Sequence, residues 1–559
     1  MKLFDKNTNA HPLIFLTLSI IVFITYHGVF LTFYQQDEWQ TLGYLTTGGW
    51  SKVINDLSAL QIFFAEGRIL ARVFYLIFFG IFQFNLTPVF LFAVLCHALN
   101  SWLVYHLVKK LKGSTLAGWI AAIFFAVNSV GSQAVAWASA VITVPATTLL
   151  LISLFWYIDF LETKDVRKRN LSFIVGILSL FIKETGLFIF FLYPMLYFLW
   201  GNGRKIKDGV IANASLLLYG GGLFIFRIAE LLFAPAAAAG FVGSQGGGLI
   251  FPVIYHSIVY PLTSFFQMFV PPLDIYAFVP RIVRSEYTYF VGSPLFDLAG
   301  QGPVADAISL IGTMFVLFVV GFMLLVEKQD TRARKTVSLG ILLAVLSFLP
   351  YVVLHRDFSY LSPRYYYVGV TGAALLLGYM VTWLYKRMFK VVGIFFIIII
   401  GLYLFHHVQA IQKDLDLQIQ YANERKTFLR EITRMHPIMN DQTVFYITSD
   451  KKYLGEITYP FQNGLGYILE VWYYDSGRIP KSFLASNFLW DLGEEGFRET
   501  EGSVFGYFEH LDKLGEEVKK RKILPAIVYG YQYSSATQKM IDITDSVREQ
   551  LATLSGVLK

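Results

Sequence analysis

The chain alternates between long apolar runs and short clusters of basic residues, and this alternation constrains its fold more than any other feature. The first run, from about residue 12 to residue 33, is long enough to cross a bilayer, because a spanning helix needs roughly 20 apolar residues. Hydrophobic residues make up 55% of the chain and charged residues only 15%. Soluble globular proteins of this size do not have that balance, so the sequence predicts a polytopic α-helical membrane protein.

The basic clusters predict the topology. They lie between apolar runs, at residues 109–112, 164–169, 204–207, 328–335 and 386–390. Loops rich in Lys and Arg stay in the cytoplasm, so the net charge of +7 is interpreted as a topology signal and not as a nucleic-acid-binding surface. We expect about eleven crossings of the plasma membrane, with the N-terminus inside and the C-terminus outside.

Eleven segments account for these crossings. They are residues 12–33, 86–108, 114–129, 134–160, two arms within 171–200, and residues 209–233, 304–326, 336–354, 364–385 and 391–409. Two other apolar runs are expected to lie at the outer interface without crossing. The run 69–84 is short and follows the charged residues Glu66 and Arg68, and the run 249–270 contains Pro252 and Pro261.

The last part of the chain has the composition of a soluble domain. We therefore divide the chain into a transmembrane domain, residues 1–409, and a small extracytoplasmic α/β domain, residues 410–559. In the second we expect an amphipathic helix over 411–432, strands at 444–448 and 526–531, and a helix over 535–554. The single cysteine, Cys96, excludes disulfide pairing within the chain and cysteine-cluster metal sites.

An acidic pair follows the first span directly. Asp37 and Glu38 come four residues after its end, at the membrane surface. A carboxylate beside hydrocarbon is costly to desolvate, which raises its basicity and suits it to remove a proton from an attacking hydroxyl. The alternative is that the pair only marks where the helix leaves the membrane.

Three cationic features are expected on the same outer side. Arg68 and Arg72 are one helical turn apart, so both guanidinium groups share a face. Lys183 and Glu184 interrupt the apolar stretch 171–200 and mark a bend between two short arms. Ionisable groups at such depth are functional candidates by default. Interfacial anchoring of the arginines and a self-contained Lys-Glu ion pair are the structural alternatives.

The third feature surrounds the start of a late span. Arg364 and Tyr365 open it, and Arg356 precedes them in the same outer loop. Arg presents a planar fork of donors that matches phosphate oxygens. A tyrosine belt with an anchoring arginine at the headgroup level is the alternative.

Taken in order, these motifs resemble the polyprenyl-phosphate-sugar-dependent glycosyltransferases of the GT-C superfamily. The similarity is greatest to the protein O-mannosyltransferase type and to the transmembrane mannosyltransferases that carry tetratricopeptide repeats. It covers about residues 12–200 and 350–385, and includes His97 to Asn100 and Ala134 to Ser139. In the turn 128–133, where family members often have His-Pro and an acidic residue, this chain has Asn-Ser-Val-Gly-Ser-Gln.

The resemblance implies a GT-C-like fold with juxtamembrane helices in the first outer loop, and roles for individual residues. Asp37 stands where the family has its catalytic base, and Glu38 completes that acidic motif. The expected donor-phosphate ligands are Arg68, Arg72, Lys183 and Arg364, with Glu184, Tyr365 and Arg356 in support.

The expected activity is therefore that of a hexosyltransferase. It would transfer a sugar, such as mannose, with inversion from a polyprenyl phosphate to a hydroxyl of a protein, glycan or lipid. Neither a metal nor another cofactor is expected, because fixed cations already neutralise a monophosphate leaving group. Three alternatives remain: a non-enzymatic transporter of lipid-linked sugars or polysaccharides, a ligase or polymerase with a lipid-diphosphate donor, and a membrane scaffold with a partner-binding tail.

Overall fold

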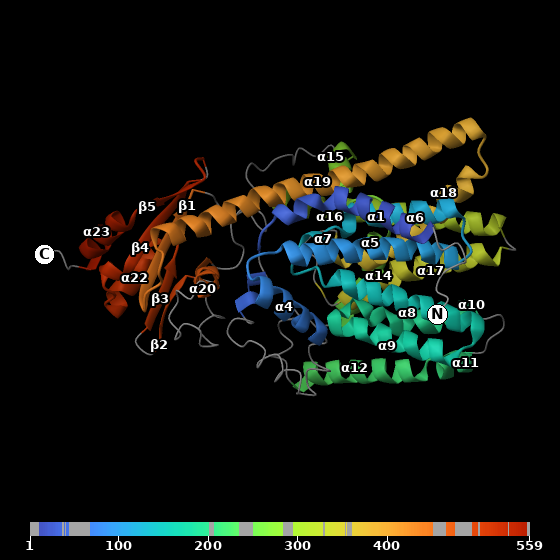
Figure 1. Cartoon of the computed structure of the whole chain (residues 1–559), viewed down its shortest axis with the longest axis horizontal. Coiled ribbons are helices and arrows are strands. Elements are labelled where there is room, and N and C mark those ends of the chain that lie inside the picture. The colour runs from blue at the N-terminus through green and yellow to red at the C-terminus, as the bar shows by residue number, and fades with distance from the viewer. Residues whose placement is uncertain are drawn as a thin grey trace. The chain divides into compact units, whose positions relative to one another are not determined.

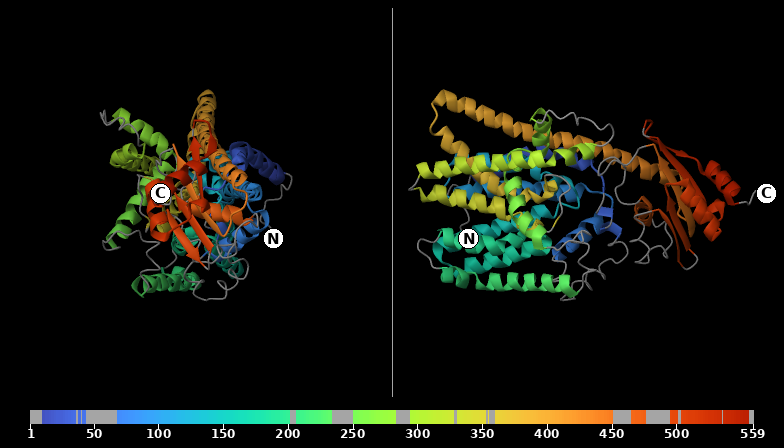
Figure 2. Two further views of the ribbon diagram at one scale, coloured as in Figure 1. Left: turned by 90° about the vertical axis from the view of Figure 1, so that its left-hand side faces the viewer. Right: turned by 180° about the vertical axis from the view of Figure 1, so that it is seen from behind.

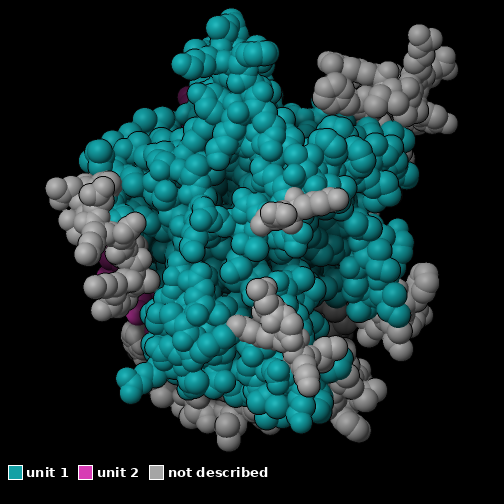
Figure 3. All heavy atoms as spheres, turned by 90° about the vertical axis from the view of Figure 1, so that its right-hand side faces the viewer, with its two compact units in different colours: residues 1–27, 57–72, 89–414 teal, residues 28–56, 73–88, 415–559 magenta. Residues whose placement is uncertain are grey.

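The protein is mostly helical, with one small sheet near its C-terminus, in a computed structural model of the whole chain (Figure 1). The residues described here are 10–35, 38–39, 41–43, 68–200, 206–233, 250–282, 294–327, 330–352, 354, 360–450, 465–475, 495–500, 503–534 and 536–555. The chain forms two compact units, coloured in Figure 3. The first comprises residues 1–27, 57–72 and 89–414, and the second residues 28–56, 73–88 and 415–559.

Most helices of the first unit run side by side (Figures 1 and 2). Its longer helices are α1 (Ala10–Tyr26), α5 (Thr87–Lys110), α6 (Thr115–Val127), α8 (Thr143–Thr163), α9 (Val166–Ile182), α10 (Ile189–Trp200), α12 (Ala214–Phe233), α14 (Ile250–Gln267), α15 (Pro272–Ile282), α16 (Pro294–Val326), α17 (Thr331–Leu346) and α18 (Tyr367–Tyr385). Short helical segments connect them: α7 (Gln133–Ala136), α11 (Ile206–Ala212), η2 (Ser129–Gly131), η3 (Glu184–Phe188), η4 (Leu349–Tyr351) and η5 (Pro363–Tyr365). Three helices contribute to both units: α4 (Ile69–Phe82), α19 (Lys390–Met435) and, by its first two residues, α5.

Several helices are long and apolar enough to cross a membrane. Within the described ranges there are seven: His11–Leu31, Thr87–Lys110, Thr143–Thr163, Gly302–Val326, Thr331–Tyr351, Tyr367–Tyr385 and Lys390–Met435. Shorter apolar helices occupy Ile69–Phe82, Thr115–Val127, Glu184–Trp200 and Ala214–Ile225. The chain is thus a multi-pass membrane protein, while the expected eleven crossings and their orientation stay predictions.

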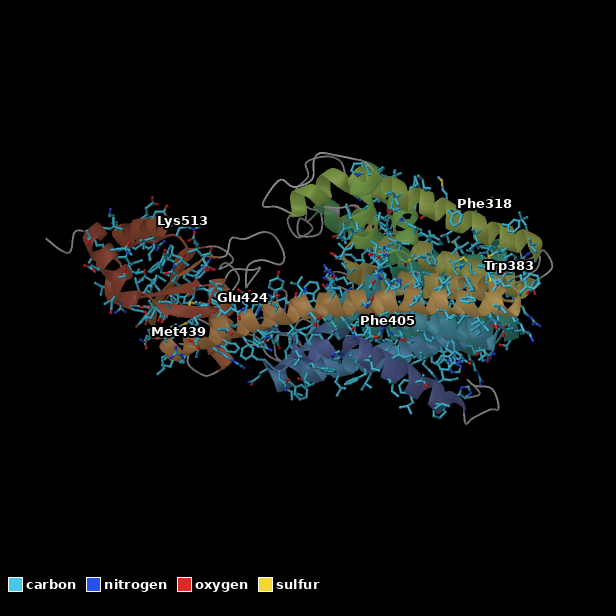
Figure 4. The ribbon with its side chains drawn as sticks, turned by 90° about the horizontal axis from the view of Figure 1, so that it is seen from above. Phe318, Trp383, Phe405, Glu424, Met439 and Lys513 are labelled. Carbon is cyan, nitrogen blue, oxygen red and sulfur yellow. The ribbon has the colours of Figure 1, made fainter. Side chains whose placement is uncertain are left out.

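Apolar side chains face both inward and outward in the first unit, as expected for a bundle that lies in lipid. Phe318 on α16 and Phe405 on α19, both labelled in Figure 4, are 72% and 55% exposed. Inside, small residues bring backbones together. A Cβ on Gly372 of α18 would lie 2.5 Å from the backbone nitrogen of Ala344 on α17, so only glycine allows this close approach, which is typical of membrane helix pairs.

The structure corrects two predicted helix starts. The span expected over 134–160 begins at Thr143, because the extended backbone at Trp137 (φ −117°, ψ 121°) ends α7 and turns the chain. In the C-terminal domain the helix expected over 535–554 begins only at Thr544 as α23 (Thr544–Ser555), because Lys539–Asp542 pairs with a neighbouring strand as β5.

The structure also joins two predicted helices. The expected span 391–409 and amphipathic helix 411–432 form one helix, α19. No proline or glycine follows Gly401 before Pro437, so nothing in this sequence stops the helix. The predicted domain boundary at 409/410 falls within it.

The second unit contains a five-stranded sheet in the order β2-β3-β1-β4-β5. The strands are β1 (Gln442–Ser449), β2 (Gly496–Thr500), β3 (Ser503–Phe508), β4 (Val528–Ser534) and β5 (Lys539–Asp542). The central strand β1 is parallel to both neighbours, with Val444 opposite Gly506 and Val528, and the two edge strands are antiparallel.

Both faces of this sheet are covered. Val444 packs on one face in a core that contains Leu514 and Val518 of α22 (Leu511–Arg521) and Val547 of α23. Phe445, the next residue, points to the other face, where its ring lies 6.3 Å from that of Tyr473 on α20 (Leu465–Asp475). This alternation is the period of two expected for strands. The two predicted strands are thus present, and β2, β3 and β5 were not predicted.

Candidate active site

The apolar stretch 171–200 is interrupted at Lys183, as predicted. Lys183 has an extended backbone (φ −158°, ψ 144°), which ends α9 and starts η3. Gly186 then lets η3 pack closely against α9, because a Cβ there would lie 2.6 Å from the Ser179 hydroxyl oxygen. The interruption places the side chains of Lys183 and Glu184 between the ends of two helices.

Lys183 and Glu184 bind different partners. The Lys183 side chain is buried, with 4% of its surface exposed, and its Nζ donates to Thr143 Oγ1 at 2.6 Å. Glu184 Oε2 instead accepts from Arg68 Nε at 2.9 Å. Lys183 and Glu184 therefore do not hydrogen-bond to each other. The bond from Arg68 to Glu184 adds Arg68 to the same cluster.

Arg364 reaches this cluster from η5 and is held in a fixed orientation. Its guanidinium carbon lies 4.6 Å from the ring centre of Trp137 and 4.7 Å from that of Tyr365. Its Nη2 donates to the Tyr365 hydroxyl at 3.1 Å, and its Nη1 donates to Gln133 Oε1 at 3.4 Å. Two aromatic rings and two hydrogen-bond acceptors thus hold the guanidinium group of Arg364 in one orientation.

Electrostatic interactions link these residues into one cationic cluster. Burial disfavours the charge of Lys183 most strongly, Glu184 favours this charge, and Arg68 and Arg364 disfavour it. The ring centre of Tyr365 lies 5.9 Å from Lys183 Nζ. With Lys183 protonated, the three cations and one carboxylate carry an excess of two positive charges, in a position that is partly screened from water. Such an arrangement can bind a phosphate group.

Tyr351 of η4 adds a polar group to the cluster. Its ring lies 4.2 Å from that of Tyr365, and its buried hydroxyl has no hydrogen-bond partner in the described part of the chain. A buried hydroxyl in that state costs free energy unless another group bonds to it. It is therefore available to a ligand oxygen beside the cations.

The remaining predicted site residues are placed as follows. Arg72 lies on the next turn of α4, its backbone N–H donating to the Arg68 carbonyl at 3.1 Å. Glu38 is buried, with 1% of its surface exposed, and belongs to the second unit. Asp37 and Arg356 lie outside the described residues.

Sequence reasoning missed four residues of this cluster, of which Tyr351 is one. Thr143, Gln133 and Trp137 contact the cations directly, but uncharged side chains in an apolar run give no signal of their own. Trp137 lies in a segment that the resemblance includes, and Gln133 lies in the turn where this chain departs from the family pattern. No pattern in the sequence indicates a role for these residues.

Among the residues with described positions, no three His, Cys, Asp or Glu side chains gather closely enough to hold an ion. The expected independence from metal remains a prediction.

Comparison with known proteins supports the expected resemblance. A search of curated proteins finds no match. A family match covers residues 69–226, a range that contains Arg72, Thr143, Lys183 and Glu184. This part of the chain matches the dolichyl-phosphate-mannose-protein mannosyltransferases, a GT-C family, as the order of its motifs predicts.

Proposed function

We propose that this protein is a membrane glycosyltransferase that takes a sugar from a polyprenyl-phosphate donor. The cationic cluster of Arg68, Lys183 and Arg364 is the observation that carries the proposal, since a phosphate is the ligand that such a cluster suits best. The family match over residues 69–226 supports transfer over transport. The sugar goes to an acceptor hydroxyl on the outer face of the membrane, and a hexose such as mannose is the first candidate.

The charge of the cluster suits the reaction. A sugar linked to a polyprenyl phosphate is a phosphodiester with one negative charge. When the sugar leaves, the phosphate monoester that remains has a charge of about −1.5 to −2 at pH 7. The excess of two positive charges therefore stabilises the departing phosphate more than the bound donor, and interactions that strengthen in the transition state are the ones that accelerate a reaction.

Asp37 is proposed as the general base. It removes the proton of the acceptor hydroxyl, whose oxygen attacks the anomeric carbon from the face opposite the phosphate, so the configuration inverts. General-base assistance typically contributes about 10²–10⁴ in rate. Glu38 completes the acidic motif, and Arg72, Glu184, Tyr365 and Arg356 are proposed to support the phosphate site.

The test is transfer by the purified protein in lipid nanodiscs. Polyprenyl phosphates carrying radiolabelled mannose or glucose are supplied with membranes of the source cell as the acceptor, in buffer containing EDTA because no metal is proposed. We expect release of polyprenyl phosphate and labelling of the acceptor. Consumption of a sugar on a lipid diphosphate, with none of the monophosphate donor consumed, would refute the proposal.

Asp37→Asn supplies the mechanistic arm of this test. The amide keeps the shape of the side chain and removes its basicity, so kcat should fall about 10²–10⁴-fold. Asp165→Asn is the matched control, because Asp165 only caps the start of α9 by accepting from the Arg167 backbone. Transfer by Asp37→Asn at the wild-type rate would disprove the assignment of the base.

A further inference from the structure

Three buried polar side chains, those of His97, Asn100 and Tyr367, form a hydrogen-bonded network inside the first unit. The Tyr367 hydroxyl lies 2.7 Å from His97 Nδ1, and Asn100 Nδ2 donates to the same hydroxyl at 3.1 Å. His97 Nε2 lies 3.0 Å from the Ala126 carbonyl, and Asn100 Nδ2 also donates to the Val144 carbonyl at 3.0 Å. None of the three side chains is more than 3% exposed. The network thus joins the helices α5, α6, α8 and α18.

The partners of this network determine which atom donates in each bond. A backbone carbonyl only accepts, so His97 Nε2 carries the hydrogen and His97 Nδ1 accepts from the Tyr367 hydroxyl. The opposite orientation of the Asn100 amide would place its oxygen against the Val144 carbonyl, so the nitrogen occupies that position. Asn100 Oδ1 is the one atom of the network without a partner among the described residues. Asn100 is therefore held through its nitrogen, by one bond to α8 and one to α18.

Both bonds of Asn100 lead to segments that carry the cationic cluster. Val144 directly follows Thr143, whose hydroxyl accepts from Lys183 Nζ at 2.6 Å. Tyr367 is the first residue of α18, and η5 with Arg364 lies immediately before it. One amide thus bridges the start of α8, which holds the lysine, and the start of α18, which follows the arginine.

The turn 128–133 brings a third segment to the same place. It follows α6, and its last residue, Gln133, accepts from Arg364 Nη1 at 3.4 Å. Gly131 lets the turn lie against the start of α18, because a Cβ there would be 3.2 Å from Tyr367 Cα. The network therefore lies behind the hydrogen-bond acceptors of two of the three cations.

We propose that Asn100 is a positioning residue for the cationic cluster. Its two hydrogen bonds hold the start of α8, and with it Lys183, in a fixed place relative to the start of α18 and Arg364. This inference rests on the proposed function. Asn100 acts through these residues, since its described hydrogen bonds go to Val144 and Tyr367 and not to a cation. Fully buried polar side chains that link membrane helices in this way favour one arrangement of those helices.

The kinetic test is Asn100→Leu in nanodiscs, since leucine has a similar volume and donates no hydrogen bond. A misplacement of about 1 Å at a reacting group can lower a rate about 100-fold, so we expect a loss of that size in kcat. The KM for the donor should change much less, because the departing phosphate has the greater charge. In a Lys183→Met background the same substitution should lower kcat only about tenfold or less, because the lysine that it misplaces is absent.

Two kinetic outcomes would overturn the proposal. One is a wild-type kcat in Asn100→Leu, and the other is an undiminished loss in the Lys183→Met background. Tyr367→Phe provides a milder variant that keeps the ring and removes the same bridge. If Asn100→Leu does not fold, a wild-type kcat in Tyr367→Phe would overturn the proposal instead.

Asn213→Leu is the matched control for loss of a buried amide. Asn213 is also fully buried, and its Nδ2 donates to the Gly209 carbonyl at 2.8 Å while its Oδ1 accepts from the Tyr157 hydroxyl at 2.9 Å. Tyr157 lies about four turns of α8, roughly 21 Å, from Thr143. We expect both leucine variants to lower the melting temperature and only Asn100→Leu to lower kcat. Equal losses of kcat would show general destabilisation and overturn the proposal.

A second measurement does not depend on transfer. Polyprenyl phosphate alone should raise the melting temperature of the wild-type protein, because a ligand that binds only the folded state stabilises it. At a ligand concentration of about 100 times the wild-type Kd, a 100-fold weaker affinity leaves roughly 15% of this rise in Asn100→Leu, whereas Asn213→Leu should keep it.

The outcomes of this measurement separate the two proposals. An equal rise in the wild-type protein and in Asn100→Leu, or no rise in the wild-type protein, would overturn the role of Asn100. A wild-type protein that binds polyprenyl phosphate and transfers no sugar would refute the proposed function, while a smaller rise in Asn100→Leu than in Asn213→Leu would still establish that Asn100 positions the cations.

Discussion

Replacement of Lys183 by Met tests the phosphate site at the residue where the loss of a charge should lower the reaction rate most. Methionine has a similar length and no charge, so the buried space stays filled. Lys183 is 4% exposed, whereas the Arg68 side chain is 45% exposed. Water screens Arg68 and not Lys183, so the two cations should differ in their effect on the reaction.

The expected magnitude follows from Coulomb's law. A unit charge about 4 Å from the one additional negative charge of the leaving phosphate interacts by about 4 kcal/mol at an effective dielectric constant of 20. At about 1.4 kcal/mol for each tenfold change, Lys183→Met should lower kcat by about 10³. Arg68 is partly exposed, so water weakens its interaction with the leaving phosphate to about 1 kcal/mol. Arg68→Gln should therefore lower kcat about fivefold.

The assay is release of polyprenyl phosphate from labelled donor in nanodiscs, with kcat and KM measured separately. Lys168→Met is the control, because Lys168 lies near the opposite end of α9 and pairs with Asp159 at 3.2 Å. Equal effects of Lys183→Met and Arg68→Gln would contradict the argument from burial. A Lys183→Met enzyme with wild-type kcat would show that this lysine only stabilises the fold.

Two further predictions concern stability. Thr143→Val removes the hydroxyl that accepts from Lys183 Nζ and should destabilise the protein by about 1.5–3 kcal/mol, measured as a lower melting temperature in nanodiscs; an unchanged melting temperature would contradict it. Burial raises the pKa of Glu470 well above its ordinary 4.5, although Arg498 acts in the opposite direction. The folded state therefore binds the carboxyl proton of Glu470 more tightly than the unfolded state does. The contribution of this proton to stability is fully present below about pH 4.5 and is lost as the pH rises. Glu470→Gln should raise the melting temperature more at pH 8 than at pH 5, and an equal change at both would refute this reasoning.

The membrane part of the fold could be predicted because its signals are local. Apolar length predicts a spanning helix, and a lysine within an apolar stretch predicts a break, which Lys183 confirms. The continuous α19 was missed because a change of composition after His407 was interpreted as a boundary, although no helix-breaking residue lies there. The strands β2 and β3 were missed because they are short and their pairing with β1 is set by partners distant in sequence.

The candidate site could be predicted only in part, for a similar reason. Charged residues in apolar surroundings are conspicuous, so Arg68, Lys183, Glu184 and Arg364 were identified. Their partners were not, because a threonine or glutamine gains its role only from what the fold brings next to it. Which charges pair is likewise a tertiary property: Glu184 bonds to Arg68 and not to its neighbour Lys183.

The bond between Lys183 and Thr143 has a consequence for biogenesis. A charged lysine within an apolar stretch is costly to place in lipid, and Lys183, where α9 ends and η3 starts, donates to the hydroxyl of Thr143 at the start of the preceding helix α8. We therefore expect α8 and α9 to pack against each other early in assembly, so that the Lys183 ammonium group is not left in lipid without an acceptor.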